Sequence, residues 1–175
     1  MDTSGVVVKA SPIQGVGIFA TRDFRAGEII LVRDESREVT PEHPLRPELG
    51  EFERHCDWLA GGRVVLLGYP ERHLNHCCDP SAYVRFTDGR DAICARRDIA
   101  AGEEITNDYC INGFGDGVWP CACGHARCRK LVRENFFAEP PAVRLEYLPL
   151  LADWFVAEHP REVEALHREA AWRAR

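Results

Sequence analysis

Short apolar runs bounded by turn residues dominate the first 110 positions of the chain, and helical spacing appears only near its end. Runs rich in Val, Ile, Leu and Phe between glycine turns predict β-strands. The expected strands cover residues 6–8, 15–20, 28–32, 64–67, 83–86, 92–95 and 104–106. Glycine turns are expected at residues 25–27, 88–90 and 100–103. The pattern therefore predicts a β-rich body.

Between residues 34 and 69 the pattern is weaker. Pro41, Pro44 and Pro47 predict a long loop over residues 34–50, because proline cannot donate to a strand ladder or continue a helix. Residues 51–60 are expected to form one short helix before the next apolar strand.

Helical periodicity begins after Phe137. Residues 140–158 and 160–172 carry apolar residues at helical spacing, with Pro149 midway along the first segment and Pro160 at a first-turn position of the second. One apolar stripe is expected to pack on its own domain, with a dimer interface as the alternative. The stripe consists of Leu145, Leu148, Ala152, Phe155 and Val156. The predicted fold class is mainly β or α+β, with C-terminal helices.

The composition indicates a globular chain of 175 residues, 45% hydrophobic and 29% charged. No apolar run approaches the ~18 to 20 residues that a membrane span requires, so no membrane partner is expected. The start lacks the basic and apolar regions of a signal peptide, which predicts a cytoplasmic protein. A net charge of -6 argues against direct nucleic-acid binding, because phosphate contacts favour a basic surface.

Eight cysteines in a reducing compartment indicate metal binding or chemistry rather than disulfides. Cys121, Cys123 and Cys128 are spaced as Cys-x-Cys-x4-Cys, and converging thiolates are what a tetrahedral zinc site needs. Spacing alone leaves the fourth ligand open between His125 and the adjacent pair Cys77 and Cys78. The glycines of residues 112–117 predict a flexible link into this cluster.

Three further segments are ambiguous when each is taken alone. Gly15-Val16-Gly17 fits an ordinary tight turn, or a backbone that a ligand can approach closely. Residues 73–81 fit a capped surface turn, or a metal site that uses His73 and His76. Residues 103–109 end in Asp108-Tyr109, and a tyrosine is more often packed than catalytic.

Taken together, in their order and spacing, the four segments resemble the SET-domain family of S-adenosylmethionine-dependent protein lysine methyltransferases. The likeness covers residues 15–30 (GxG), 72–81 (NHxCxPN-like), 98–109 (GEExTxDY) and 121–131 (CxCx4CR). It implies a SET-domain β-fold of several small sheets, in which a knot-like crossing brings Asn75-His76 beside Asp108-Tyr109. The implied divisions are residues 1–115 as the SET domain, with a variable insert at about 34–69, residues 116–135 as a zinc-binding post-SET segment, and residues 136–175 as a helical tail.

The resemblance implies methyl transfer from S-adenosylmethionine to the ε-amine of a lysine in a protein substrate, with Tyr109 as the catalytic residue. The implied cofactor-binding residues are Gly15, Val16, Gly17, Asn75, His76, Tyr109 and Leu131. A structural zinc ion is implied on Cys78, Cys121, Cys123 and Cys128, which leaves His125 outside the ligand set. Two alternatives stay open: methylation of a free amino acid or small metabolite, and a non-catalytic module that binds the cofactor or a partner.

The chain departs from the family pattern at three positions. Asn107 stands where many relatives carry Phe or Tyr, so the number of methyl groups transferred is left open. Cys77 replaces the usual Ser and Ser81 the usual Asn, and we expect the cofactor site to tolerate both small polar substitutions.

Overall fold

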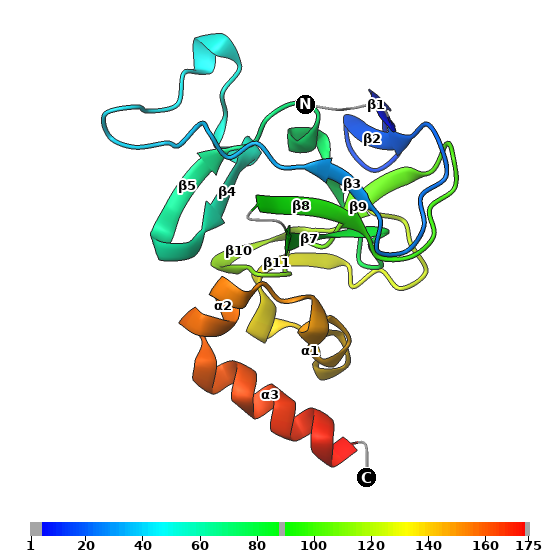
Figure 1. The fold of residues 1–175 in the computed structure, drawn as a ribbon, viewed down its shortest axis with the longest axis vertical. Helices are drawn as coiled ribbons and strands as arrows, with labels where there is room; N and C mark the ends of the chain where they lie inside the picture. Colours follow the sequence, from blue (N-terminus) through cyan, green and yellow to red (C-terminus); the bar gives the residue numbers. More distant parts are fainter. Residues whose placement is uncertain (1–4, 88–89, 174–175) are drawn as a thin grey trace.

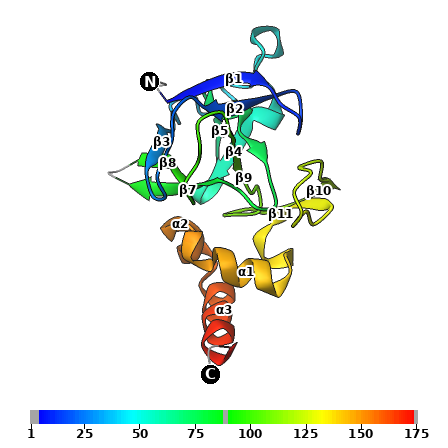
Figure 2. The same ribbon diagram turned by 90° about the vertical axis from the view of Figure 1, so that its right-hand side faces the viewer.

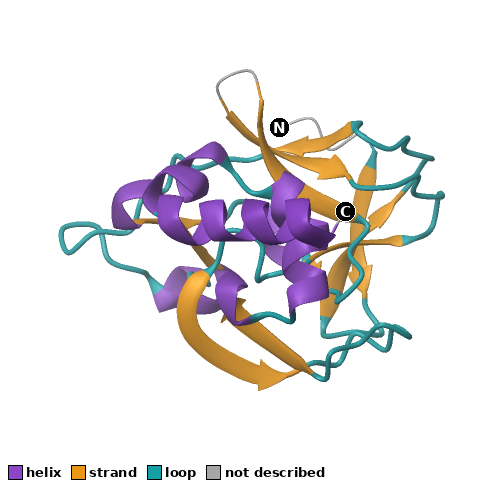
Figure 3. Ribbon diagram, turned by 90° about the horizontal axis from the view of Figure 1, so that it is seen from below, coloured by secondary structure: helices purple, strands orange, loops and turns teal. Residues whose placement is uncertain are grey.

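A computed structural model describes residues 5–87 and 90–173 of the chain. Small sheets form the body, and the helices gather at one end of it (Figures 1 and 2). Seen from that end, the helices lie together over the strands (Figure 3). The predicted mainly β or α+β class, with C-terminal helices, is confirmed.

The largest sheet has four strands in the order β1-β2-β9-β6. They are β1 (Val6–Ala10), β2 (Val16–Ala20), β9 (Glu104–Asn107) and β6 (Asn75–His76). The pairs β1/β2 and β2/β9 are antiparallel, whereas β6 pairs with β9 in parallel. The parallel pairing places two segments about thirty residues apart side by side, as the predicted adjacency of Asn75-His76 and Asp108-Tyr109 requires.

A second sheet has the order β3-β8-β7, with β3 (Ile29–Val32), β8 (Arg90–Ala95) and β7 (Ala82–Thr87). The turn predicted at residues 88–90 falls largely outside the described residues. Side chains from both sheets form the first core, because their inward positions are apolar. Its buried members are Ile18, Ala20, Phe24, Ile30, Leu31, Ala82, Ile93, Ala95, Ile99 and Ile105.

The helix predicted over residues 51–60 is wrong. A single 3-10 turn, Glu53–His55, leads into β4 (Cys56–Leu59), which pairs antiparallel with β5 (Arg63–Leu66). Gly61 and Gly62 both have positive φ, a conformation that glycine adopts without steric cost, and they close this tight hairpin. Cross-strand pairing therefore overrides the weak helical pattern of the segment.

The flexible link predicted at residues 112–117 is also wrong, because most of it belongs to a strand. Here β10 (Phe114–Pro120) pairs antiparallel with β11 (Leu131–Asn135). The glycines allow close approach rather than motion: a Cβ on Gly113 would lie 2.0 Å from the backbone oxygen of Glu134. The loop between these two strands holds the predicted cysteine cluster.

The first tail helix is shorter than its periodicity predicts. It divides into α1 (Pro141–Tyr147), a 3-10 turn (Leu148–Leu150) and α2 (Asp153–Glu158), because Pro149 has no N–H for a continuous helical ladder. The next helix, α3 (Pro160–Arg173), starts at the predicted proline. Further 3-10 turns cover Pro47–Leu49, Ala60–Gly62, Glu71–His73 and Phe136–Ala138. Among the described residues, none of the helices combines the length and apolar character needed to cross a bilayer.

The tail packs on the body through a second core. Its buried members are Cys110, Ile111, Phe136, Tyr147, Phe155 and Leu166. Leu148 lies against this core, so Phe155 and Leu148 of the predicted stripe pack on their own domain. Cys110, the residue after Tyr109, therefore belongs to the same core as the side chains of the tail.

A buried guanidinium attaches the insert to the second sheet. Arg33, directly after β3, donates to Glu71 and Asp57, each at 2.7 Å. Asp91 of β8 lies 3.8 Å from the same side chain. Because the Arg33 side chain is only 4% exposed, its charge needs these carboxylates, and they fix the β4–β5 hairpin relative to β3.

The first core yields a stability prediction. Ile105→Ala should lower the free energy of unfolding by about 2–5 kcal/mol, since the fully buried side chain leaves a cavity beside Ile18. Val7→Ala, on the exposed side of β1, is the control and should change it by less than about 0.5 kcal/mol. Urea unfolding followed by circular dichroism measures both. Equal values for the two variants would contradict the assigned core.

Candidate functional site

Residues of β2 and β9 hold the side chain of Asn75, on β6, in one orientation. Its Nδ2 group donates to the Val16 carbonyl at 3.0 Å and to Glu104 Oε1 at 2.8 Å. The Ser11 hydroxyl donates to the same carboxylate, at 2.8 Å to Oε1. Glu104 therefore fixes Asn75 between β2 and β9, a role that the sequence alone did not assign to it.

The two glycines of the GxG segment have different roles. Gly15 has φ +50°, and a Cβ there would meet nothing within 4 Å, so this glycine serves the turn and leaves open space beside it. A Cβ on Gly17 would lie 2.1 Å from Glu104 Oε1 and 3.0 Å from Asn75 Nδ2. Gly17 is therefore required by the packing of β2 against the Asn75–Glu104 hydrogen bond.

His76 and Tyr109 lie in contact at the end of the parallel strand pair. The Tyr109 backbone N–H donates to His76 Nδ1 at 3.3 Å, and the ring centroids are 5.3 Å apart. Burial lowers the pKa of His76, which keeps the imidazole neutral near pH 7. With Nδ1 as acceptor, the proton of the neutral ring is on Nε2, which lies 3.4 Å from Cys78 Sγ.

The phenol of Tyr109 is oriented by the backbone. Its hydroxyl donates to the Leu74 carbonyl at 2.8 Å, while 40% of the residue stays exposed. Burial raises the pKa of Tyr109 to about 12, so the phenol is protonated at physiological pH. Because the hydroxyl hydrogen is used by Leu74, the oxygen lone pairs remain as acceptors for another group.

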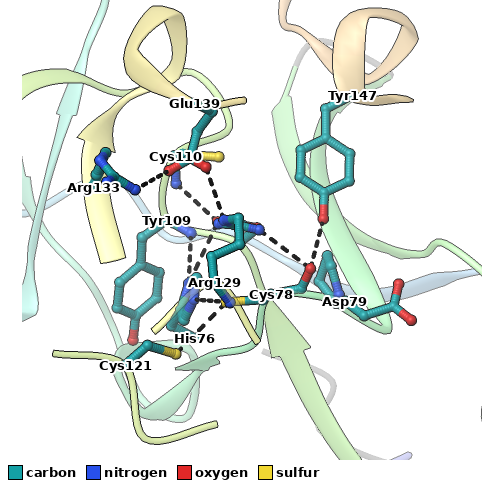
Figure 4. A network of polar contacts seen from close by, with 12 residues as sticks. His76, Cys78, Asp79, Tyr109, Cys110, Cys121, Arg129, Arg133, Glu139 and Tyr147 are labelled. Atoms are coloured by element: carbon teal, nitrogen blue, oxygen red, sulfur yellow. Dashed lines mark hydrogen bonds and ion pairs between the residues drawn. The ribbon is translucent and has the colours of Figure 1, made fainter. Parts of the chain in front are cut away.

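A buried ion pair connects the residue before Tyr109 to Arg129 of the cysteine loop, and Figure 4 shows Arg129 beside Cys78. Asp108, whose side chain is fully buried, lies 2.7 Å from Arg129 Nη2. Arg129 also donates through Nη1 to the Cys78 carbonyl at 3.2 Å and through its backbone N–H to Cys78 Sγ at 3.3 Å. One arginine directly after Cys128 therefore contacts both the residue before Tyr109 and a predicted metal ligand.

Four cysteine sulfurs converge from two distant parts of the chain. The Sγ atoms of Cys78, Cys121, Cys123 and Cys128 all lie within 4.8 Å of one another, and those of Cys78 and Cys121 are 3.7 Å apart. Thiolates at ~2.3 Å from one zinc ion in a tetrahedron would be roughly 3.8 Å apart, so this arrangement fits such an ion. Of the candidates for the fourth ligand, Cys78 is the one that the described residues group with the three loop cysteines. His125 instead has Nε2 3.6 Å from Asp79 Oδ2.

The thiols of the cluster differ in acidity before any metal charge is added. Burial raises the pKa of Cys121 to about 11, and it also raises that of Cys78. Burial disfavours the Cys123 thiolate too, but hydrogen bonds from the backbone of Cys78 and His125 outweigh it and hold the pKa of Cys123 at about 7. A bound cation would favour the thiolate form of all four.

An aromatic residue that the sequence did not single out completes one side of the site. The Trp119 ring on β10 lies 6.5 Å from that of Tyr109, and 37% of the residue is exposed. Next to Trp119 on β10, Pro120 pairs with Leu131 of β11. Leu131 therefore lies beside β10, where the chain leaves the cysteine loop. The predicted role of Leu131 as an adenine cover stays a prediction.

Comparison with known proteins gives a consistent family. A sequence model described as the SET domain matches residues 15–110, more than half of the chain. The histone-lysine N-methyltransferase trithorax of Drosophila melanogaster is 33% identical over 135 residues, which cover 71% of this chain and 4% of the relative. The histone-lysine N-methyltransferase, H3 lysine-36 specific, of Candida albicans is 30% identical over 142 residues, 74% of this chain and 17% of the relative.

The chain thus spans less than a fifth of the length of either relative. Among solved structures, a candidate histone methyltransferase from Plasmodium falciparum covers 59% of this chain and 90% of its own, at 19% identity and a TM-score of 0.47.

The cysteine geometry predicts about one zinc ion per chain. Cys123→Ser should abolish stoichiometric zinc, because three thiolates and a hydroxyl hold the ion far less tightly than four thiolates. Cys56→Ser, which changes a cysteine outside the cluster, is the control and should retain it. Elemental analysis of purified, chelator-washed protein measures the content. A well-folded wild-type protein free of zinc, with eight titratable thiols, would remove the metal assignment.

Proposed function

This chain belongs to the SET-domain family, and on that premise we propose that it transfers a methyl group from S-adenosylmethionine to the ε-amine of a lysine in a protein substrate. The observation that carries the proposal is the convergence of three family motifs. Gly17, Asn75-His76 and Tyr109 come from separate segments and meet at β2, β6 and the end of β9. The curated relatives, named as histone-lysine N-methyltransferases, support lysine as the acceptor.

The residues around this convergence suit the cofactor. Bound S-adenosylmethionine would supply a methyl group made electrophilic by the positive sulfonium. The open space at Gly15 leaves backbone accessible to an elongated ligand, and Asn75 and His76 are held in fixed orientations beside it. The exposed rings of Tyr109 and Trp119 offer π-faces that favour a neighbouring cation.

Tyr109 is the proposed catalytic residue. Its oxygen keeps lone pairs free because the hydroxyl hydrogen is donated to Leu74, so it can accept a hydrogen bond from the incoming amine. In this role it orients the amine for in-line attack at about 3 Å, and most of the rate gain comes from that positioning. The acceptor lysine must lose its proton first, which an apolar channel and a nearby positive charge both favour.

The four cysteines would hold a structural zinc ion. Such an ion joins Cys78, beside His76, to the loop at residues 121–128. Its chemical contribution is to fix this loop, and with it Arg129 and the start of β11, close to Tyr109. Zinc removal is therefore expected to disorder the loop and weaken cofactor binding.

Tyr109→Phe tests the catalytic assignment. Loss of the phenol oxygen should lower kcat by about 100-fold or more, because one positioned polar group in a transition state contributes that much. Tyr69→Phe, which changes an exposed tyrosine, is the control and should leave kcat unchanged. The assay follows labelled methyl from S-adenosylmethionine into a cell extract and into purified histones, separated into protein and small-molecule fractions.

Three outcomes are informative. Label in the protein fraction supports the proposal, and label only in small molecules would replace the protein lysine by a metabolite acceptor. If the chain binds the cofactor but labels neither fraction, the proposed activity is wrong and the chain is a non-catalytic module.

Gly17→Ala tests the cofactor site by geometry. The new Cβ would displace the Glu104 carboxylate or the Asn75 amide, so the dissociation constant of S-adenosylmethionine should rise roughly tenfold or more. Val7→Ala removes only part of an exposed side chain on β1, outside the proposed cofactor-binding residues, so its affinity should stay near that of the wild type. Isothermal titration calorimetry measures both. Equal affinities would place the cofactor elsewhere.

A further inference from the structure

We infer that residues 139–147, the start of the helical tail, act as a positioning element that holds the cysteine loop closed against the site. This inference deepens the proposed function and rests on it for the consequence in catalysis. The geometry behind it is independent: residues 139–147 direct polar contacts at the loop and at Cys78 from three separate side chains, Glu139, Glu146 and Tyr147.

The first contact completes a buried charge network. Glu139 Oε2 lies 2.8 Å from Arg129 Nε, and neither side chain is more than 9% exposed. Arg129 also pairs with Asp108, so two buried carboxylates share one guanidinium, with Arg133 3.9 Å from Glu139 as a second cation. The tail thus supplies one of the charges that fix Arg129 in the position from which it reaches Cys78 (Figure 4).

The second contact reaches the backbone of a cysteine of the cluster. The Tyr147 hydroxyl, on a residue only 1% exposed, donates to the Cys78 carbonyl at 3.2 Å. The same carbonyl accepts from Arg129 Nη1. Loop and tail therefore meet on one oxygen atom, and the ring of Tyr147 is anchored in the second core.

The third contact bridges loop, body and tail by charge. Glu146 of α1 pairs with Arg127, which lies inside the cysteine loop, and with Arg96, directly after β8. Asp79 joins the same two arginines, at 3.2 Å from Arg127 and 3.0 Å from Arg96. This cluster is partly exposed, so each pair alone is weak, but the four side chains form a network across three parts of the chain.

The ion pairs of the last helix are arranged differently. The ion pairs of α3, Glu164 with Arg168 and Glu169 with Arg173, join residues of the helix itself. A tail that only covered the second core would need its apolar side chains and no polar group directed at Cys78. The contacts at residues 139–147 therefore reach the loop and Cys78, which the ion pairs of α3 do not.

The double variant Glu146→Gln/Tyr147→Phe tests the inference, because it removes the charge and the hydroxyl while keeping the size of both side chains. Amide hydrogen exchange across residues 121–131 should accelerate about tenfold, and zinc transfer to a chelator should accelerate by a similar factor. The KM for S-adenosylmethionine should rise about fivefold with a smaller change in kcat, since the loop is loosened while Tyr109 is untouched. Glu164→Gln, which breaks a pair within α3, is the matched control and should match the wild type in all three measurements.

Unchanged exchange and zinc release in the double variant would overturn the inference. Neither measurement needs a methyl acceptor, so both test the inference even if the chain transfers no methyl group. Absence of methyl transfer would refute the proposed function and leave the inference about the tail standing. If the double variant has a lower melting temperature, Glu146→Gln alone carries the test, because that side chain is partly exposed. Faster exchange of the loop is again expected, and wild-type exchange again overturns the inference.

Discussion

The buried pair of Asp108 and Arg129 is the interaction on which the site depends. Burying a carboxylate is costly unless a partner compensates it, and among the described residues of the cysteine loop Arg129 is the one that pairs with Asp108. This pairing brings together segments whose sequence positions differ widely: the end of β9, the turn at Cys78 and the loop after Cys128. The position of Tyr109, directly after Asp108, is therefore coupled to the order of the loop.

The proposed cofactor side of the site also depends on a buried or partly buried carboxylate with fixed partners. Glu104 is held by Ser11 and in turn holds Asn75, which leaves no room for a Cβ at Gly17. A hydrogen-bonded carboxylate thus occupies the space that a Cβ at position 17 would need, so a larger residue there would have to displace it. The choice of glycine at position 17 therefore follows from the contact between Glu104 and Asn75, which are both distant in sequence.

Sequence reasoning found what local pattern and motif spacing encode. The strands of both larger sheets other than the two-residue β6, the helical tail and the three clustered cysteines carry strong local signals, and the motif context added Cys78. The helix expected at residues 51–60 failed because Trp58 and its neighbours are satisfied by pairing with β5, a contact that no local window contains. The glycines after Asn112 suggested flexibility, whereas they accommodate Glu134 from the partner strand. Glu104 and Arg129 stand inside the quoted motifs without an assigned role, and Trp119 was not singled out, because the roles of all three are defined only by tertiary neighbours.

The loop itself explains why metal, charge and tail would all be needed. Every residue of the described segment 121–130 keeps some exposure above that of a core position, so burial of apolar surface cannot hold it in place. The Arg129 pairs and the contact from Glu146 act on two points of the loop, and Tyr147 holds the adjoining Cys78 carbonyl. The proposed thiolate ligation of zinc would add a further restraint at Cys78, Cys121, Cys123 and Cys128. Since these restraints are polar, they would depend on ionisation and metal supply rather than on the stability of the sheets. We therefore expect the loop to open while the body stays folded, which is the property that a cover over the proposed cofactor site needs.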